Sequence, residues 1–249
     1  MREQANQNKI AWEYRAYEMR TSRETIQEKA KEILDNPKSF LRYHQKYFEN
    51  ITGKRIANVC GSDGRRTIPF AVLGAEETVF DISEPQMKYA LELAEAVGVK
   101  LDYVLGDFIE TDVAKYGNMF DILYMEGGIL HYFSDIDAFT QILCAITKPG
   151  GRMILCDFHP YRKLFSTELT DGDYFDSRLH NAGAPLRTCA PEEEQDAFPK
   201  ILVRYYNISE IINSVINAGF TLKEFIEHNY QEYKDGKIPT EFTIIADKK

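Results

Sequence analysis

Between residues 55 and 159, short runs of β-forming residues alternate with helical segments, and this alternation constrains the fold more than any other feature. The runs expected to form strands are RIANVC, ETVFDI, LDYVLGD, FDILYME and RMILCDFH. After a further helix over residues 207–220, TLKEFIEH and EFTIIAD supply two more strands. Strands that alternate with helices build βαβ units, and hence a parallel sheet with helices on both faces. The sequence therefore predicts an α/β fold with a doubly wound, mostly parallel sheet of seven strands.

Two segments stand outside this alternation. Residues 1–50 show helical spacing of apolar residues and predict an N-terminal helical cap before a domain over residues 51–249. Residues 160–204 contain scattered proline, glycine and acidic residues, and they are long for a plain connection. They predict an excursion over the active face or a small pair of strands.

Helix starts are predicted from capping residues. Thr21 with Glu24, and Ser83 with Gln86, have the spacing of capping boxes. Ser134 stands where the helix over residues 134–147 is expected to begin.

Charge and composition narrow the classes of function. The 249 residues carry 30 Lys and Arg against 39 Asp and Glu, and the net charge of −9 opposes binding to a phosphate backbone. No apolar run reaches the roughly 20 residues that span a bilayer, and the polar N-terminus lacks a signal-peptide core. The four cysteines form no C-x-x-C pair and are expected to be reduced. We expect a cytoplasmic protein, a monomer or homodimer, that acts on a small molecule and not on nucleic acid or a membrane.

Three successive strand ends carry residues suited to a nucleoside-like ligand. Residues 61–64, with glycine at 61 and 64, separate the first strand from the next helix, where backbone approaches a ligand closely. Asp81 follows the second strand, 17 residues after Gly64, which is about the spacing of a ribose-binding carboxylate. Gly106, Asp107 and Phe108 end the third strand. Ligands of open parallel sheets bind at these carboxyl ends.

These residues resemble the class I S-adenosylmethionine-dependent methyltransferases over residues 54–159. The family's first motif places an acidic residue before three alternate glycines, and this chain has Asn58, Cys60, Ser62 and Gly64 at those positions. DISEPQM is similar to the second motif and GDF to the third. The stretch over residues 120–160, with its KPGG turn, resembles the family's fourth strand through its fifth. The resemblance implies a Rossmann-like methyltransferase fold.

The resemblance also implies which residues bind S-adenosylmethionine. Asp81 would accept hydrogen bonds from the ribose hydroxyls, and Asp107 from the adenine amino group. The backbone at residues 60–62 would face the methionine moiety. The loss of the acidic residue at Asn58 either weakens cofactor binding or is compensated by Asp63 or by a residue of the N-terminal helix. The full set of expected cofactor contacts is Tyr14, Tyr17, Arg20, Asn58, Cys60, Gly61, Ser62, Gly64, Asp81, Ile82, Met87, Asp107, Phe108 and Glu126.

The absence of three methyltransferase motifs narrows the class of methyl acceptor. MEGG stands where amino-group methyltransferases of adenine, cytosine or glutamine carry N/D-P-P-Y, and there is neither a Pro-Cys nucleophile pair nor a double-glutamate loop. A small-molecule acceptor methylated on O, N or C is left. His131 and His159 are the acid–base candidates because imidazole accepts a proton near neutral pH. Packing with one hydrogen bond is the alternative role for each. Their spacing with Asp157 is not diagnostic of a metal site, so no metal is expected.

Two other functions share part of this evidence. A nicotinamide-dependent oxidoreductase would use the same loop and ribose carboxylate, but it leaves Gly106, Asp107 and Phe108 unexplained. A non-catalytic module that binds S-adenosylmethionine, or has lost it, would explain the replaced glycines. For Tyr14 and Tyr17, packing of the N-terminal helix is as well supported as contact with the cofactor.

Overall fold

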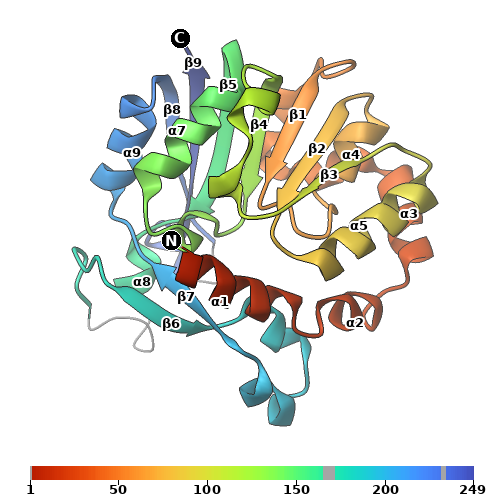
Figure 1. Cartoon of the computed structure of the whole chain (residues 1–249), viewed down its shortest axis with the longest axis horizontal. Coiled ribbons are helices and arrows are strands. Elements are labelled where there is room, and N and C mark those ends of the chain that lie inside the picture. The colour runs from red at the N-terminus through yellow and green to blue at the C-terminus, as the bar shows by residue number, and fades with distance from the viewer. Residues whose placement is uncertain (1, 165–171, 231–233) are drawn as a thin grey trace. The chain divides into compact units, whose positions relative to one another are not determined.

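The computed structural model describes residues 2–164, 172–230 and 234–249. Seven strands form one sheet, as the alternation predicted, and their order is β3-β2-β1-β4-β5-β9-β8 (Figure 1). The strands are β1 Arg55–Val59, β2 Glu76–Asp81, β3 Asp102–Leu105, β4 Phe120–Glu126, β5 Thr147–Phe158, β8 Phe220–His228 and β9 Glu241–Lys248. The chain divides into two compact units, which we call the β1 unit (Lys9–Thr111 and Ala184–Pro199) and the β4 unit (Met1–Asn8, Asp112–Gly183 and Lys200–Lys249).

The β1 unit contains the parallel strands β1, β2 and β3. Its helices pack an apolar core in which Ile33, Ile68, Val79 and Leu93 are each fully buried. The helical elements of this unit are α2 Ala16–Thr21, α3 Ile26–Asp35, η1 Pro37–Phe48, α4 Ile68–Val72, α5 Glu84–Val97, η2 Phe108–Glu110, η4 Pro185–Cys189 and η5 Glu192–Ala197.

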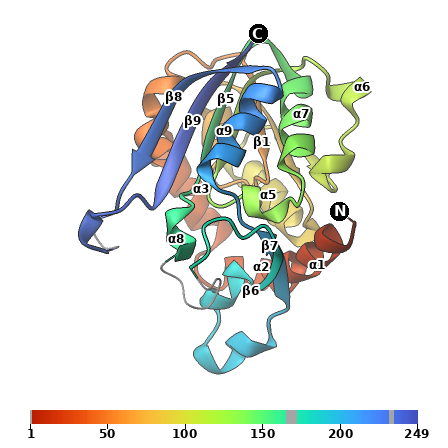
Figure 2. The ribbon, with the colours of Figure 1, turned by 90° about the vertical axis from the view of Figure 1, so that its left-hand side faces the viewer.

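The β4 unit pairs β4 with β5 in parallel, and β5 with β9 and β9 with β8 in antiparallel. The long β8–β9 pair lies in the foreground of Figure 2. A second sheet, β6 Leu179–Gly183 with β7 Lys200–Arg204, confirms the strand pair expected within residues 160–204. The helical elements of this unit are α6 Val113–Tyr116, η3 Leu130–Tyr132, α7 Ile136–Ile146, α8 Tyr161–Leu164, α9 Ile208–Asn217 and η6 Lys234–Gly236.

The first helix, α1 Arg2–Glu13, begins in the β4 unit, where amide side chains attach it to the edge of β7. Asn8 donates to the carbonyl of Leu202 at 3.0 Å and accepts from the amide of Leu202 at 2.7 Å. Gln4 also donates to the Leu202 carbonyl, and Gln7 donates to that of Lys200, each at 3.0 Å. These bonds satisfy backbone groups that an edge strand otherwise leaves unpaired. No helix within the described ranges is long and apolar enough to cross a membrane.

Three of the predicted helix starts were wrong in detail. The capping box is Thr25 with Glu28, because Thr21 is the last residue of α2. The N-cap of α7 is Asp135, whose carboxylate accepts from the amide of Ala138 at 2.9 Å. Ser83 is the N-cap residue of α5 but makes no side-chain cap, because its hydroxyl donates instead to the carbonyl of Trp12 at 3.3 Å.

Glu77 on β2 is a carboxylic acid inside the β1 unit. Its residue is 3% exposed, and neither carboxyl oxygen has a hydrogen-bond partner among the described residues. Burial raises the pKa of Glu77 well above its ordinary value. The folded chain therefore holds a proton that the unfolded chain releases above about pH 4.3. The contribution of Glu77 to stability is therefore fully present below that pH and is lost as the pH rises.

Replacing Glu77 with methionine should raise the free energy of unfolding at pH 7 by about 2 kcal/mol, because an unpaired buried polar group costs about 1–3 kcal/mol. Urea denaturation at pH 7 and pH 4 measures the gain, which should shrink at pH 4. Glu76→Met is the matched control, since the Glu76 side chain is 64% exposed. Equal stability of Glu77→Met and the unaltered chain at pH 7 would show that Glu77 is paired in solution.

Candidate functional site

The loop after β1 adopts left-handed backbone conformations at alternate residues. Cys60 has φ of 54°, Ser62 of 50° and Gly64 of 72°. These are the three positions at which the resemblance places glycines. A left-handed conformation costs a residue with a side chain about 1–2 kcal/mol. The loop therefore keeps the backbone shape of the motif although two of its glycines are replaced.

Hydrogen bonds from three different elements hold Ser62 in this conformation. Its amide donates to Asp81 Oδ2 at 2.9 Å, and its carbonyl accepts from the Tyr103 hydroxyl at 2.8 Å. Its hydroxyl accepts from Arg20 Nη2 at 3.4 Å. The strain at Ser62 is thus offset by contacts with β2, β3 and α2.

Asp81 joins the loop to the start of α5. Its Oδ1 accepts from the amide of Ser83 at 3.0 Å, while its Oδ2 accepts from Ser62. Burial raises the pKa of Asp81 to about 6, against the opposing effect of these backbone donors. Each carboxylate oxygen has a second lone pair. A fixed carboxylate at this strand end can therefore accept two hydroxyl hydrogen bonds from a ligand.

Gly61 is required by the packing of Asn58 beneath the loop. A Cβ at residue 61 would lie 2.1 Å from Asn58 Oδ1 and 3.0 Å from Val79 Cγ1. Asn58 is 3% exposed. The residue at the acidic position of the motif is therefore buried under the loop.

Arg20 is paired within the protein by Asp63. Its Nε lies 2.9 Å from Asp63 Oδ2, and the two side chains are 15% and 6% exposed. Arg20 Nε also donates to Gln86 at 3.3 Å. Arg20 thus attaches α2 to the loop and to α5, which is a positioning role beside the predicted contact with a ligand.

The tyrosines of the N-terminal segment pack against the β1 unit. The Tyr14 ring meets Phe198 edge-on at 5.0 Å. The Tyr17 hydroxyl donates to Glu92, and the ammonium of Lys88 lies 4.1 Å from its ring centroid. These contacts favour the packing role for both tyrosines.

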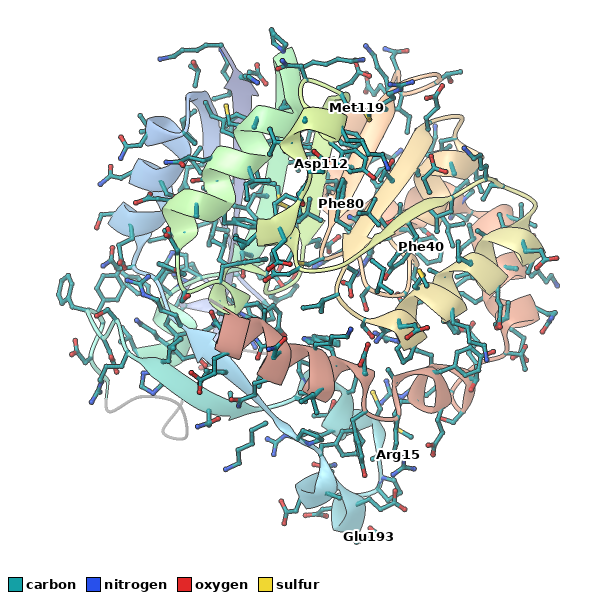
Figure 3. All side chains as sticks on the ribbon, in the orientation of Figure 1. Arg15, Phe40, Phe80, Asp112, Met119 and Glu193 are labelled. Carbon is teal, nitrogen blue, oxygen red and sulfur yellow. The ribbon has the colours of Figure 1, made fainter. Side chains whose placement is uncertain are left out.

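The third strand end presents Asp107 beside an open glycine. Gly106 has φ of 156°, and a Cβ there would have nothing within 4 Å. Asp107 Oδ1 accepts from the amide of Ile109 at 3.1 Å, and burial raises the pKa of Asp107. Phe108 is 5% exposed and packs edge-on against Phe80, labelled in Figure 3, with ring centroids 5.6 Å apart. Ile82 and Met87 are half-buried.

In the β4 unit, Asp157 organises the turn that follows β4. Its Oδ2 accepts from the amides of Ile129 and Leu130, each at 2.8 Å, and its Oδ1 from that of Phe158 at 2.6 Å. Burial raises the pKa of Asp157 to about 6 in spite of these donors. Glu126, half-buried at the end of β4, accepts from the Tyr124 hydroxyl.

The two predicted histidines differ in how their ring nitrogens are used. His159 is 1% exposed, and its Nδ1 accepts from the amide of Tyr161 at 3.2 Å. That bond assigns the proton to Nε2, which faces Glu227 Oε1 at 3.0 Å. His131 is half-buried, and neither of its ring nitrogens has a hydrogen-bond partner in the described part of the chain. Of these two histidines, only His131 therefore has a ring nitrogen lone pair available to a ligand.

Two residues that support the candidate site, Tyr103 and Asp157, have no local sequence signal for that role. Tyr103 lies inside β3, where an aromatic residue is ordinary, and its side chain reaches the loop after β1 although β2 lies between the two strands in the sheet. The role of Asp157 depends on the folding back of residues 127–130. Among the described residues, no group of three or more His, Cys, Asp or Glu side chains is placed to hold a metal ion.

Known proteins similar to this chain share both sequence and fold. Residues 56–151 match the family model described as a methyltransferase domain. The ubiquinone biosynthesis O-methyltransferase of Methylobacterium nodulans is 32% identical over 116 residues, which are 46% of this chain and 45% of that protein. The enzyme of the same name from Proteus mirabilis is 22% identical over 195 residues, covering 76% of this chain and 77% of the other. The chain spans about half the length of the first curated relatives that it matches.

Solved structures share the fold at low sequence identity. The S-adenosylmethionine-dependent methyltransferase from Methanosarcina mazei has a TM-score of 0.62 at 16% identity, covering 83% of this chain and 97% of that one. Magnesium protoporphyrin IX methyltransferase from Synechocystis, solved with bound S-adenosylhomocysteine, has a TM-score of 0.54 at 16% identity, over 88% and 82%. The [4+2]-cyclase SpnF has a TM-score of 0.57 at 14% identity, over 80% and 76%.

Proposed function

The chain belongs to the class I S-adenosylmethionine-dependent methyltransferase family, and we propose that it transfers the methyl group of this cofactor to a small-molecule acceptor. The observation that carries the proposal is the Asp81 carboxylate, fixed at the end of β2 by the amides of Ser62 and Ser83. The product is S-adenosylhomocysteine. The cofactor supplies an activated methyl group, so the protein supplies proximity and orientation.

The residues of the β1 unit fit the cofactor that the family uses. Asp81 would hold the ribose hydroxyls, and the backbone at Cys60, Gly61 and Ser62 the methionine end. Asp107 would accept from the adenine amino group, where the open space at Gly106 leaves room for a ligand. Ile82 and Met87 would flank the adenine. Phe108, expected to cover the other face of the adenine, is 5% exposed and packs edge-on against Phe80.

Of the possible acceptor atoms, the relatives best support methyl transfer to an oxygen atom. Several of them are named O-methyltransferases. A hydroxyl needs a hydrogen-bond acceptor as its proton leaves. His131 fits this role better than His159, whose lone pair is used by the Tyr161 amide. Burial and the nearby Arg162 lower the pKa of His131 to about 4, so its imidazole is neutral at pH 7 and accepts a hydrogen bond, but it is a weak base. The net charge of −9 supports a small acceptor in place of nucleic acid. The cytoplasmic location and the monomeric or homodimeric state stay predictions.

Transfer of labelled methyl groups tests the proposal. The purified chain, incubated with methyl-labelled S-adenosylmethionine and a panel of small hydroxylated compounds, should yield a labelled product one methyl group heavier than its acceptor. Binding of the cofactor without transfer to any member of a broad panel would favour the second candidate, a non-catalytic module. The fold also occurs in a [4+2]-cyclase, so the fold by itself does not establish methyl transfer.

The affinity for S-adenosylhomocysteine should depend on pH through Asp81. Because the pKa of Asp81 is raised to about 6, the carboxylate is ionised at pH 7 and accepts hydroxyl hydrogen bonds at full strength. Protonation below pH 6 should weaken binding by about tenfold per pH unit. Titrations between pH 5 and 8 measure this, and Asp81→Asn should show a flat profile. An unaltered chain whose affinity is constant over this range would contradict the assigned role.

A further inference from the structure

The peptide group between Ser62 and Asp63, in the loop after β1, has an N–H that the protein leaves unbonded. This backbone N–H of Asp63 has no hydrogen-bond partner among the described residues, although the residue is only 4% exposed. The neighbouring loop amides are bonded, since Gly61 donates to the carbonyl of Phe80 at 3.3 Å and Gly64 to that of Gly61 at 3.1 Å. Buried backbone N–H groups almost always have a partner. The amide of Asp63 is therefore a donor available to a ligand.

The direction of this N–H is fixed by Tyr103. The Tyr103 hydroxyl donates to the carbonyl of Ser62 at 2.8 Å. Because the peptide group is planar and trans, the carbonyl oxygen of Ser62 and the N–H of Asp63 point in opposite directions. The bond to Tyr103 on one side of the peptide group therefore directs the unbonded N–H to the other side. Burial and the carboxylate of Asp81 raise the pKa of Tyr103, so its hydroxyl stays protonated and donates.

Tyr103 belongs to a row of side chains that supports the loop. The strands β3, β2 and β1 lie side by side (Figure 1), and their register places Tyr103 beside Val79 and Val79 beside Asn58. Register partners of neighbouring parallel strands have their side chains on the same face of the sheet. Val79 is fully buried, Asn58 is 3% exposed, and both lie directly under Gly61 of the loop. The Tyr103 hydroxyl therefore reaches the loop from a packed row and not from a mobile side chain.

We propose that Tyr103 is a positioning residue for the cofactor, because its hydroxyl orients the peptide group through which the Asp63 amide donates to S-adenosylmethionine. The proposal rests on the proposed function and adds one ligand-binding group and the residue that orients it. A glycine at position 62 would adopt the left-handed conformation without a steric penalty. Ser62, with φ of 50°, has that penalty, and the bond from Tyr103 offsets it. The importance of the Tyr103 hydroxyl therefore depends on the side chain at position 62.

A double-mutant cycle on the affinity of the full chain for S-adenosylhomocysteine tests the proposal. Tyr103→Phe removes only the hydroxyl and should weaken binding by about tenfold, because a hydrogen bond that holds the binding conformation is lost. In a Ser62→Gly background the same change should weaken binding by about twofold or less, because glycine needs no such bond. Tyr43→Phe is the matched control, since Tyr43 is a 37% exposed ring on η1 of the same unit, and it should leave the affinity unchanged.

The amide of Asp63 gives a second readout, which a merely structural role of Tyr103 would not change. When the isotope-labelled chain is saturated with S-adenosylhomocysteine, the NMR signal of this amide should move downfield. Its hydrogen exchange should slow by about tenfold or more, because a bonded N–H exchanges slowly. Both effects should be smaller in Tyr103→Phe at saturation, whereas Tyr43→Phe should match the unaltered chain.

Three results would overturn the positioning role and leave the proposed function standing. They are an affinity of Tyr103→Phe within about twofold of the unaltered chain, an equal loss of affinity in both backgrounds, and an Asp63 amide that S-adenosylhomocysteine leaves unchanged. Failure of the unaltered, folded chain to bind S-adenosylhomocysteine removes the proposed function and the role of Tyr103 with it.

Discussion

Replacing Asp81 with alanine should weaken the binding of S-adenosylhomocysteine by at least about 100-fold. Two hydrogen bonds from ribose hydroxyls to a carboxylate are worth about 1.5 kcal/mol or more each, so their loss amounts to about 3 kcal/mol. The same change frees the amides of Ser62, in the loop after β1, and of Ser83, before α5. Equilibrium dialysis with labelled S-adenosylhomocysteine gives the two dissociation constants directly.

The controls for this prediction lie on the same strand. Glu76→Ala removes an exposed carboxylate of β2, paired with Arg55, and should leave the affinity unchanged. Asp81→Asn keeps the size of the side chain and should fall between the two. An Asp81→Ala variant that is folded and binds within threefold of the unaltered chain would show that the second strand end does not hold the ribose.

Replacing Gly61 with alanine should destabilise the chain by about 2–3 kcal/mol. The new methyl group would lie 2.1 Å from Asn58 Oδ1 and 3.0 Å from Val79 Cγ1. Both neighbours are in the buried core of the β1 unit and cannot both move away, and overpacking of a core costs about 1–3 kcal/mol. The expected fall in melting temperature is about 5–10 °C for a chain of this size. Urea denaturation followed by circular dichroism measures the change.

A double-mutant cycle shows whether the Asn58 side chain is the cause. In an Asn58→Ala background the nearest blocking atoms are gone, so Gly61→Ala should then cost less than about 1 kcal/mol. The difference is the coupling energy between the two positions. Equal costs of Gly61→Ala in both backgrounds would mean that the loop moves away from Asn58 without strain.

The sheet and its strand ends could be predicted from the sequence because they depend on local patterns. The β-forming runs and the spacing between Gly64 and Asp81 each reflect a period or a distance along the chain. Helix starts were harder, since several acceptors compete within a few residues. Ser134 and Asp135 are adjacent residues of about equal N-cap preference, and the structure has Asp135 as the N-cap of α7.

The hydrogen bonds that hold the loop of the candidate site could not be predicted, because they join residues far apart in the chain. Tyr103 reaches the loop from 41 positions away and Arg20 from 42. Compared with the glycine motif, the loop lacks two glycines. Ser62 nevertheless has a left-handed backbone, and it is held by bonds to Asp81 and Tyr103 that no local sequence pattern indicates. The two candidate histidines likewise cannot be told apart from the sequence. The structure distinguishes them because the amide of Tyr161 donates to His159.

Calorimetric titration of the purified chain with S-adenosylhomocysteine is the most direct test of the central claim, that the altered loop still forms a cofactor site. The structure leads us to expect saturable binding of one molecule per chain, with the loop held by Asp81, Tyr103 and Arg20. Absence of any binding heat over a range of temperatures, from a chain shown to be folded, would contradict the account and mean that the replaced glycines had removed the site.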